Sequence, residues 1–130
     1  MTPDEYIKIL VHQAEDDLGA AEALNSAGYY GQALFWLHLV LEKFCKALWV
    51  HKNQNTEHPF IHNLLSLLKG SGVKLTNEQI IIYSDMNQFQ SKGRYAPELE
   101  AIEKTVTKQT SDLYFMKVKT ETIWLKSQLQ

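Results

Sequence analysis

The sequence contains a single cysteine, Cys45, and no long hydrophobic run among its 130 residues. One cysteine cannot form an intramolecular disulfide, so a disulfide-stapled fold is excluded, and the apolar residues around Cys45 predict a buried thiol. No segment is apolar for long enough to cross a bilayer, and the acidic start with Asp4 and Glu5 is unlike a secretory signal. We therefore expect a soluble, cytoplasmic protein that makes no contact with a membrane.

Arginine is also scarce: the 13 basic residues comprise twelve lysines and one arginine, Arg94. The formal net charge is -2 and the isoelectric point is near 6.2, which argues against a protein that coats nucleic acid by bulk electrostatic attraction. Any contact with RNA would therefore be local. Arg94 is the first candidate for such a contact, because arginine is the better bidentate partner for phosphate.

Several catalytic and cofactor-binding signatures are missing as well. The sequence has no glycine-rich phosphate loop, no nucleophile elbow, no closely spaced pair of cysteines and no dinucleotide-binding fingerprint. Catalysis by those routes is excluded, and we expect no cofactor.

What the sequence does contain is helical periodicity along most of its length. The chain has the size of one domain, residues 1–130, and 45% of its residues are hydrophobic and available for a core. Thr2 and Glu5 form a capping-box pattern around Pro3, which is favourable at the first helical position. This pattern predicts a first helix that ends near Ser26.

The second helix, predicted from Tyr30 to Lys52, carries more apolar residues than one stripe can hold. A helix that is apolar nearly all round is buried on most sides, either at the centre of a bundle or partly in a subunit interface. We therefore expect a central helix and a homodimer that buries the excess apolar surface.

The second half of the sequence predicts shorter helices. One should open at Pro59 and end at Gly70, and another should start at the capping box of Thr76 and Gln79 and end near Ser91. Residues 92–104 have the composition of a loop. The last helix should run from about Thr107 to Gln128, with Leu113, Met116, Thr120 and Ile123 on its apolar stripe and Tyr114, Val118 and Leu125 beside it. These elements predict an all-α fold, an antiparallel up-and-down bundle of four to five helices.

One block of residues carries a resemblance to a known family. It consists of Gly28-Tyr29-Tyr30, Ala33-Leu34-Phe35, Glu42-Lys43 and Lys46-Ala47-Leu48, preceded by Ala14, Asp17-Leu18 and Ala21, and followed by His62-Asn63-Leu64, Leu67-Leu68 and Gly93-Arg94-Tyr95. In their order and spacing these residues resemble the pattern of the HEPN family, and the resemblance covers nearly the whole chain. It implies a HEPN-like helical bundle.

The resemblance also implies what the protein lacks. HEPN members that cleave RNA carry an arginine followed four to six residues later by a histidine, since the arginine holds the phosphate and the histidine moves a proton. In this chain Arg94 is followed by no histidine, and none occurs after His62. The resemblance therefore favours a protein without the family's ribonuclease activity.

What remains resembles the small stand-alone HEPN proteins that are paired with minimal nucleotidyltransferases, in a toxin-antitoxin-like, stress or defence context. That resemblance implies a non-catalytic module that recognises a nucleotide or RNA phosphate, or a partner nucleotidyltransferase. The residues it assigns to ligand binding are Asp17, Glu42, Lys43, Lys46, Arg94 and Tyr95. Two alternatives stay open, a degenerate HEPN ribonuclease toxin that acts as a dimer, with His38 as one substitute for the lost histidine, and a purely structural protein-interaction bundle.

Charged residues on the second helix allow two interpretations. Glu42 and Lys46 lie one turn apart and can pair, and His38 lies one turn before Glu42 on the same face. These residues could form a solvated polar strip. If the helix is buried, they need partners instead, for which Asp17 and Arg94 are the candidates.

His58 and His62 have the four-residue spacing that can hold zinc on one helical face. Pro59 sits between them at the predicted helix start, which places His58 outside the helix. No cysteine completes a ligand set. We therefore expect no metal, and we expect His62 to cap or pack against the second helix.

Overall fold

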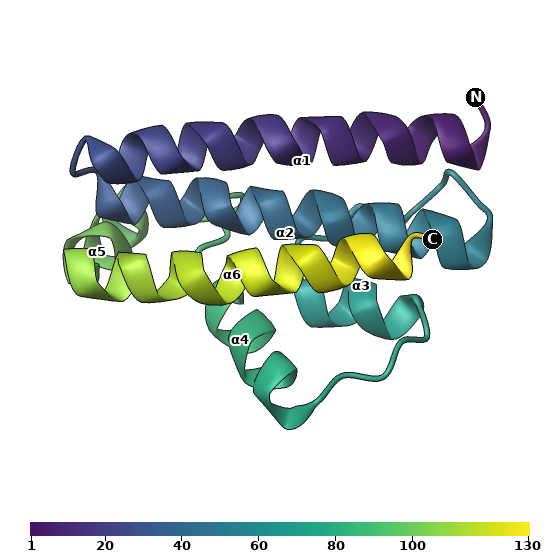
Figure 1. Ribbon diagram of the computed structural model, residues 1–130. Coiled ribbons are helices and arrows are strands. Elements are labelled where there is room, and N and C mark those ends of the chain that lie inside the picture. The colour runs from purple at the N-terminus through teal and green to yellow at the C-terminus, as the bar shows by residue number, and fades with distance from the viewer.

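The structure is a computed structural model that describes residues 1–130. It contains six α-helices and no strand: α1 (Pro3–Ser26), α2 (Tyr30–Asn53), α3 (Leu64–Gly70), α4 (Asn77–Asn87), α5 (Ala96–Thr105) and α6 (Lys108–Gln128). The long helices α1, α2 and α6 lie side by side, and the shorter α3, α4 and α5 connect α2 to α6 (Figure 1). This arrangement confirms the predicted all-α bundle.

None of the six helices combines the length and the apolar character that a bilayer crossing requires.

Local capping explains where the long helices begin. The hydroxyl of Thr2 accepts a hydrogen bond from the backbone N–H of Glu5 at 3.2 Å, and Pro3 occupies the first helical position of α1. Thr107 caps α6 in the same way through the N–H of Thr110. Between α1 and α2 the chain turns through Gly28, whose φ of 88° lies in the left-handed region that favours glycine.

The direction of α6 follows from its contacts with α1. Ser111 at the start of α6 donates a hydrogen bond to Asn25 at the end of α1 (2.6 Å), and Lys126 near the end of α6 pairs with Glu15 at 3.2 Å. The two helices are therefore antiparallel. Because α1 and α2 form a hairpin, α6 runs in the same direction as α2, and α3 to α5 provide the crossover that this direction requires (Figure 1).

The core is organised around α2, as its composition predicts. Its side chains Leu34, Leu37, Leu41, Phe44 and Leu48 are fully buried or nearly so, together with Cys45. On α1, the small residues Ala14 and Ala21 face α2 with no exposed surface, which lets the two helices approach closely.

Three predicted boundaries are corrected by the structure. Helix α3 begins at Leu64 and not at Pro59, because the side chain of Asn63 caps it and accepts a hydrogen bond from the N–H of Ser66 (3.2 Å). Helix α4 ends at Asn87, earlier than Ser91. The predicted loop over residues 92–104 is wrong, because residues 96–105 form α5, which has a proline in its first turn.

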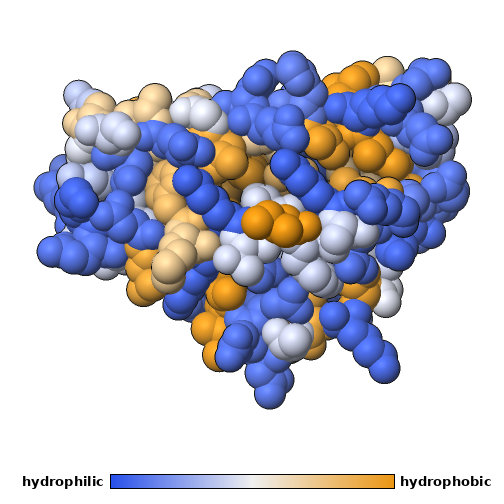
Figure 2. Space-filling view, in the orientation of Figure 1, coloured by the Kyte–Doolittle hydropathy of each residue, from blue (hydrophilic) through white to orange (hydrophobic).

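The predicted apolar stripe of α6 is also wrong. Leu113, Met116 and Ile123 are exposed, and the buried apolar side chains of α6 are Phe115, Val118 and Leu125 on the opposite side. Both sets recur at helical spacing, so periodicity alone does not decide which set faces inward. Figure 2 shows hydrophobic residues at the surface over α6 and α4, separated by hydrophilic ones.

Helix α5 packs on the start of α2 at a position where only glycine fits. A Cβ on Gly31 would lie 2.7 Å from the Cα of Glu103. Beside this contact, the side chain of Gln32 donates a hydrogen bond to the carboxylate of Glu103 at 3.2 Å. Helix α5 itself has no fully buried residue, and its half-buried Ile102 packs against the core beside this close approach.

Candidate functional site

Four polar residues gather on one side of α2 and form what we name the Glu42 cluster: His38, Glu42, Lys46 and His62. The carboxylate of Glu42 accepts hydrogen bonds from Nζ of Lys46 at 2.8 Å and from Nδ1 of His62 at 2.9 Å. His38 donates a hydrogen bond from Nε2 to the backbone carbonyl of His62 at 3.1 Å. Helix α2 supplies three members at four-residue spacing, and the segment before α3 supplies His62.

Burial makes these charges interdependent. Desolvation raises the pKa of Glu42, but the hydrogen bonds and charges of Lys46 and His62 outweigh it, so the pKa of Glu42 lies below its ordinary value. Desolvation also lowers the pKa of His38 to about 4, with the negative charge of Glu42 opposing the shift. Glu42 is therefore ionised and His38 neutral at neutral pH.

A second ion pair joins α2 to α1. Nζ of Lys43 lies 2.5 Å from the carboxylate of Asp17, which is itself mostly buried. The predicted residues Asp17, Glu42, Lys43 and Lys46 are thus all internally paired, two by two. The structure supports the interpretation in which buried charges need partners, and Glu42 finds them in Lys46 and His62.

Arg94 has different partners from those expected. It pairs with neither Asp17 nor Glu42, and its guanidinium instead contacts the carboxylate of Glu98 one turn into α5. It also donates to the carbonyls of Gln90 (2.6 Å) and Gln88 (3.0 Å), just after α4. Arg94 therefore fastens the end of α4 to the start of α5, since a cation is favourable where helix carbonyls are left unpaired.

The other residues predicted in this loop and the histidines lie apart from one another. The side chain of Tyr95, at the N-terminus of α5, is exposed (79%) and forms no hydrogen bond to another side chain. His58 accepts a hydrogen bond from the hydroxyl of Tyr6 (2.8 Å) and donates to the carbonyl of Pro59 (3.0 Å). His62 points instead to Glu42, and no group of three His, Cys, Asp or Glu side chains is placed to hold a metal ion.

Helix α2 leaves one face only partly covered, which we name the α2 outer face: Tyr29, Trp36, Leu39, Lys43 and Lys46. From Trp36 onward these positions follow one another at three- or four-residue steps, and Tyr29 lies two helical turns before Trp36, so all five share one stripe. Tyr29 and Trp36 are exposed, and Leu39 and the two lysines are half-buried. The stripe therefore combines an apolar end with a basic end.

A second polar cluster escaped the sequence analysis. Glu121 of α6 is buried and accepts hydrogen bonds from Gln79 and Tyr83 of α4, at 3.0 and 2.9 Å. The signal was present, because Glu121 lies three residues after Val118 and four before Leu125, both buried. This signal was missed because the face of α6 with Leu113, Met116 and Ile123 was predicted to be the inner one.

Comparisons with known proteins complete these observations. A family model of the HEPN domain matches residues 7–113, more than half of the chain. No curated protein and no solved structure matches the chain significantly.

Proposed function

The chain belongs to the HEPN family, and on that premise we propose that it is a non-catalytic HEPN-type binding module that forms a homodimer and binds a partner nucleotidyltransferase. One observation carries the proposal. The basic side chains predicted to hold phosphate are already paired inside the domain, whereas the aromatic side chains of the α2 outer face stay exposed.

The arrangement of histidines favours binding over catalysis. A general acid or base must reach the substrate proton directly or through one water. His38 is buried and engaged with the carbonyl of His62, and His62 donates to Glu42. The loop with Arg94 contains no histidine at all. The degenerate ribonuclease alternative thus has no free histidine near Arg94 or in the Glu42 cluster. The buried position of His38 disfavours its action across a dimer.

Charge balance favours protein over phosphate as the ligand. Asp17 offsets Lys43, and Glu42 offsets Lys46, so these four residues have a formal sum of zero. An incoming phosphate would have to compete with carboxylates that lie within 3 Å of both ammonium groups. A protein partner makes no such demand, because it can cover Tyr29 and Trp36 without breaking either pair.

The α2 outer face suits a symmetric dimer. In a two-fold contact the same stripe meets itself, so the aromatic end of one copy covers apolar or basic positions of the other. Trp and Tyr are the residues most enriched at the centres of such interfaces, since they bury large area at low entropic cost. The dimer would present two identical binding surfaces to a partner nucleotidyltransferase.

A phosphate ligand is the second candidate, and one observation favours it. The side chains of Lys43 and Lys46 keep 25% and 12% of their surface exposed, both on the α2 outer face. Titration with AMP and ATP tests this candidate directly. Saturable binding that is lost in the double variant Lys43→Met/Lys46→Met would establish it.

Sedimentation velocity of three purified proteins tests the dimer: the parent, Trp36→Asp and Ile9→Asp. Trp36 and Ile9 are similarly exposed, 39% and 44%, and Ile9 lies on α1, away from the α2 outer face, so Ile9→Asp is a matched control. We expect the parent and Ile9→Asp to be dimers and Trp36→Asp to be a monomer, because an aspartate buried in the interface lacks a partner.

The binding function is tested by co-expression of each variant with a minimal nucleotidyltransferase encoded beside its gene. We expect the parent and Ile9→Asp to co-purify with that protein and Trp36→Asp to lose it. RNA is incubated with the same samples, with and without magnesium. Cleavage by the parent, abolished in Arg94→Ala, would refute the non-catalytic proposal.

A further inference from the structure

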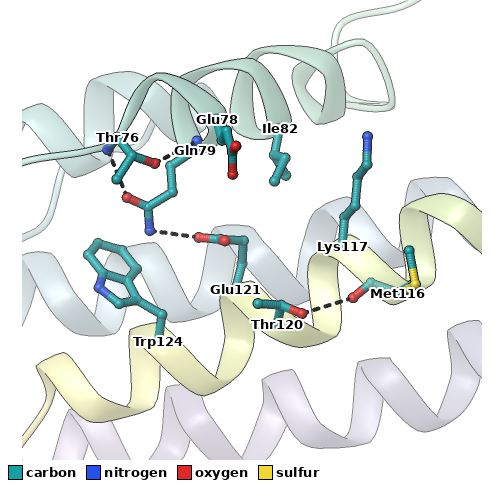
Figure 3. Close-up of a pocket in the computed structure, with 9 residues that line it drawn as sticks. All are labelled: Thr76, Glu78, Gln79, Ile82, Met116, Lys117, Thr120, Glu121 and Trp124. Carbon is teal, nitrogen blue, oxygen red and sulfur yellow. Dashed lines mark hydrogen bonds between the residues drawn. The ribbon is translucent and has the colours of Figure 1, made fainter.

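A cavity of about 520 Å³ lies between α4 and α6, and none of its nine lining residues belongs to the Glu42 cluster or to the α2 outer face. Figure 3 shows Thr76, Glu78, Gln79 and Ile82 on the α4 side facing Lys117, Glu121 and Trp124 of α6. The volume is in the range of cavities that bind small organic molecules.

Only one oxygen of the Glu121 carboxylate is used within the protein. Oε1 accepts hydrogen bonds from Nε2 of Gln79 at 3.0 Å and from the hydroxyl of Tyr83 at 2.9 Å. Oε2 has no hydrogen bond, yet every fully buried side-chain oxygen or nitrogen of the chain has a partner. Oε2 is therefore open to the cavity that Glu121 lines.

The donors to Oε1 fix the orientation of this carboxylate. Burial raises the pKa of the Tyr83 phenol, so its hydroxyl stays protonated and continues to donate to Glu121. Gln79 is held in turn by the capping box of α4, in which its side chain accepts from the N–H of Thr76 (3.0 Å). The free oxygen is thus presented to the cavity by a rigid support.

The two buried glutamates of the chain differ in one respect. Glu42 is 4% exposed and pairs with Lys46 and His62, whereas Glu121 is 5% exposed and forms no ion pair. An ionised carboxylate this deep is normally paired with a cation, since desolvation is costly. Neutral donors alone satisfy one oxygen of Glu121, and the other faces a space large enough for a ligand.

The remaining walls favour an organic cation. The carboxylate of Glu78 points into the same gap from α4, and the indole ring of Trp124 stands at one end of it (Figure 3). Aromatic rings attract cations over their faces. Ile82 and Met116 supply apolar contacts for a short carbon chain, while the ammonium of Lys117 rises at the end away from Trp124 (Figure 3).

We propose that the cavity between α4 and α6 binds an organic cation, a guanidinium or primary ammonium group on a short apolar stem. The head lies between Oε2 of Glu121 and the ring of Trp124, and the stem runs along Ile82 and Met116. Lys117 repels the head and so sets its direction in the cavity. Free small molecules carry such a group, and so does an arginine or lysine side chain of a partner protein.

Isothermal titration with n-butylguanidinium tests the proposal on the parent, Glu121→Gln, Glu100→Gln and Lys117→Gln. We expect Glu121→Gln to bind at least about tenfold more weakly, the loss that follows from removal of one charge-assisted hydrogen bond. The glutamine retains an oxygen that accepts from Tyr83 and Gln79, so the variant folds, and circular dichroism checks this. Glu100 is an exposed carboxylate on α5, and its variant should bind as the parent does.

Lys117→Gln gives a prediction of opposite sign: removal of the repelling charge should tighten binding about two- to fivefold. n-Butyrate, which has the same stem and a negative head, should not bind. Chemical-shift perturbation identifies the location, because the indole N–H signal of Trp124 should move on titration. Those of Trp36 and Trp49 should not move.

Two ligand sources are separated by comparison with the blocked peptide Ac-Ala-Ala-Arg-Ala-Ala-NH2. Tighter binding of the peptide than of butylguanidinium assigns the cation to a partner's side chain, and the reverse order assigns it to a free small molecule. Either result supports the cavity as a cation site. The proposal is overturned if butylguanidinium shows no saturable binding up to tens of millimolar, or if Glu121→Gln binds it as the parent does.

Discussion

Replacement of Glu42 by glutamine should destabilise the domain strongly, because it removes the charge that compensates two buried cationic or hydrogen-bonding groups. Glu42 accepts from Lys46 at 2.8 Å and from His62 at 2.9 Å, and only 12% of the Lys46 side chain is exposed. Removal of one partner of a buried pair costs about 3–5 kcal/mol. The glutamine can still accept one hydrogen bond, so we expect a loss of about 3 kcal/mol, near the lower end of that range.

Urea unfolding, followed by far-ultraviolet circular dichroism at pH 7, measures this loss. A decrease of about 3 kcal/mol corresponds to a melting temperature lowered by about 10 °C for a domain of this size. Glu100→Gln is the control, since Glu100 and its partner Lys104 are well exposed and such pairs contribute at most about 1 kcal/mol. A loss below about 1 kcal/mol in Glu42→Gln would refute the description of Glu42 as a buried anchor.

Two further measurements sharpen the test. The double variant Glu42→Leu/Lys46→Met should lose less stability than Glu42→Gln alone, because it leaves no uncompensated charge on Lys46. The pKa of Glu42 is held below its ordinary value in the folded state. Its contribution is therefore complete above the pKa of the unfolded chain and disappears as the pH falls through the lower folded pKa, so the stability curves of parent and Glu42→Gln should converge in acid.

Four other predictions concern single positions. The pKa of His38 is lowered from 6.5 to about 4, so between these pH values the unfolded chain binds a proton that the folded chain does not. The free energy of unfolding should therefore fall by about 3 kcal/mol from pH 6.5 to pH 4. Urea titrations across that range should show a smaller decrease for His38→Gln. Gly31→Ala should cost about 1–3 kcal/mol and speed amide exchange in α5, because the new methyl meets the backbone of Glu103. Gly19→Ala on α1, where nothing lies within 4 Å, should instead stabilise by about 1 kcal/mol in the same urea assay. Cys45 is buried, and burial raises its pKa, so a disulfide reagent should label it only as fast as the protein unfolds.

Elements with local signals were predicted well. The starts of α1 and α6 depend on Thr2 and Thr107, whose hydroxyls contact backbone only three residues away. The capping box of α4, Thr76 with Gln79, was likewise confirmed with both of its hydrogen bonds present. Such signals are complete within a few residues, so no tertiary information is needed to interpret them.

Features that depend on packing were not predicted. Helix α5 has no fully buried residue, and its apolar side chains Leu99 and Ile102 are only half-buried, so its hydrophobic signal is short, and Pro97 suits a loop as well as a first helical turn. The partner of Arg94, Glu98, was missed for the same reason, because the spacing of four residues matters only if the segment is helical. The inner face of α6 is set by its packing against α2 and α4, which the sequence order alone does not reveal.

Among the predicted site residues, the sequence located the polar positions of α2 but not their connections. Lys43 and Lys46 were grouped as one ligand-binding set, yet they pair with carboxylates of two different helices, Asp17 of α1 and Glu42 of α2. His62 lies twenty residues after Glu42, and its hydrogen bond to that carboxylate requires the chain to fold back on α2. Ligand binding by these residues remains a prediction, tested by the titrations above.

The direction of α6 has a consequence for synthesis on the ribosome. Helices α1 and α2 can form their hairpin early, but the side of α2 that α6 covers stays open until residues 108–128 have left the exit tunnel. Ser111 and Lys126 meet residues of α1 that were made about a hundred positions earlier, so α6 closes contacts of very large sequence separation. Until α6 has emerged, the nascent chain exposes apolar side chains of α2 that are buried in the complete fold, and we expect it to depend on chaperones most heavily in that interval.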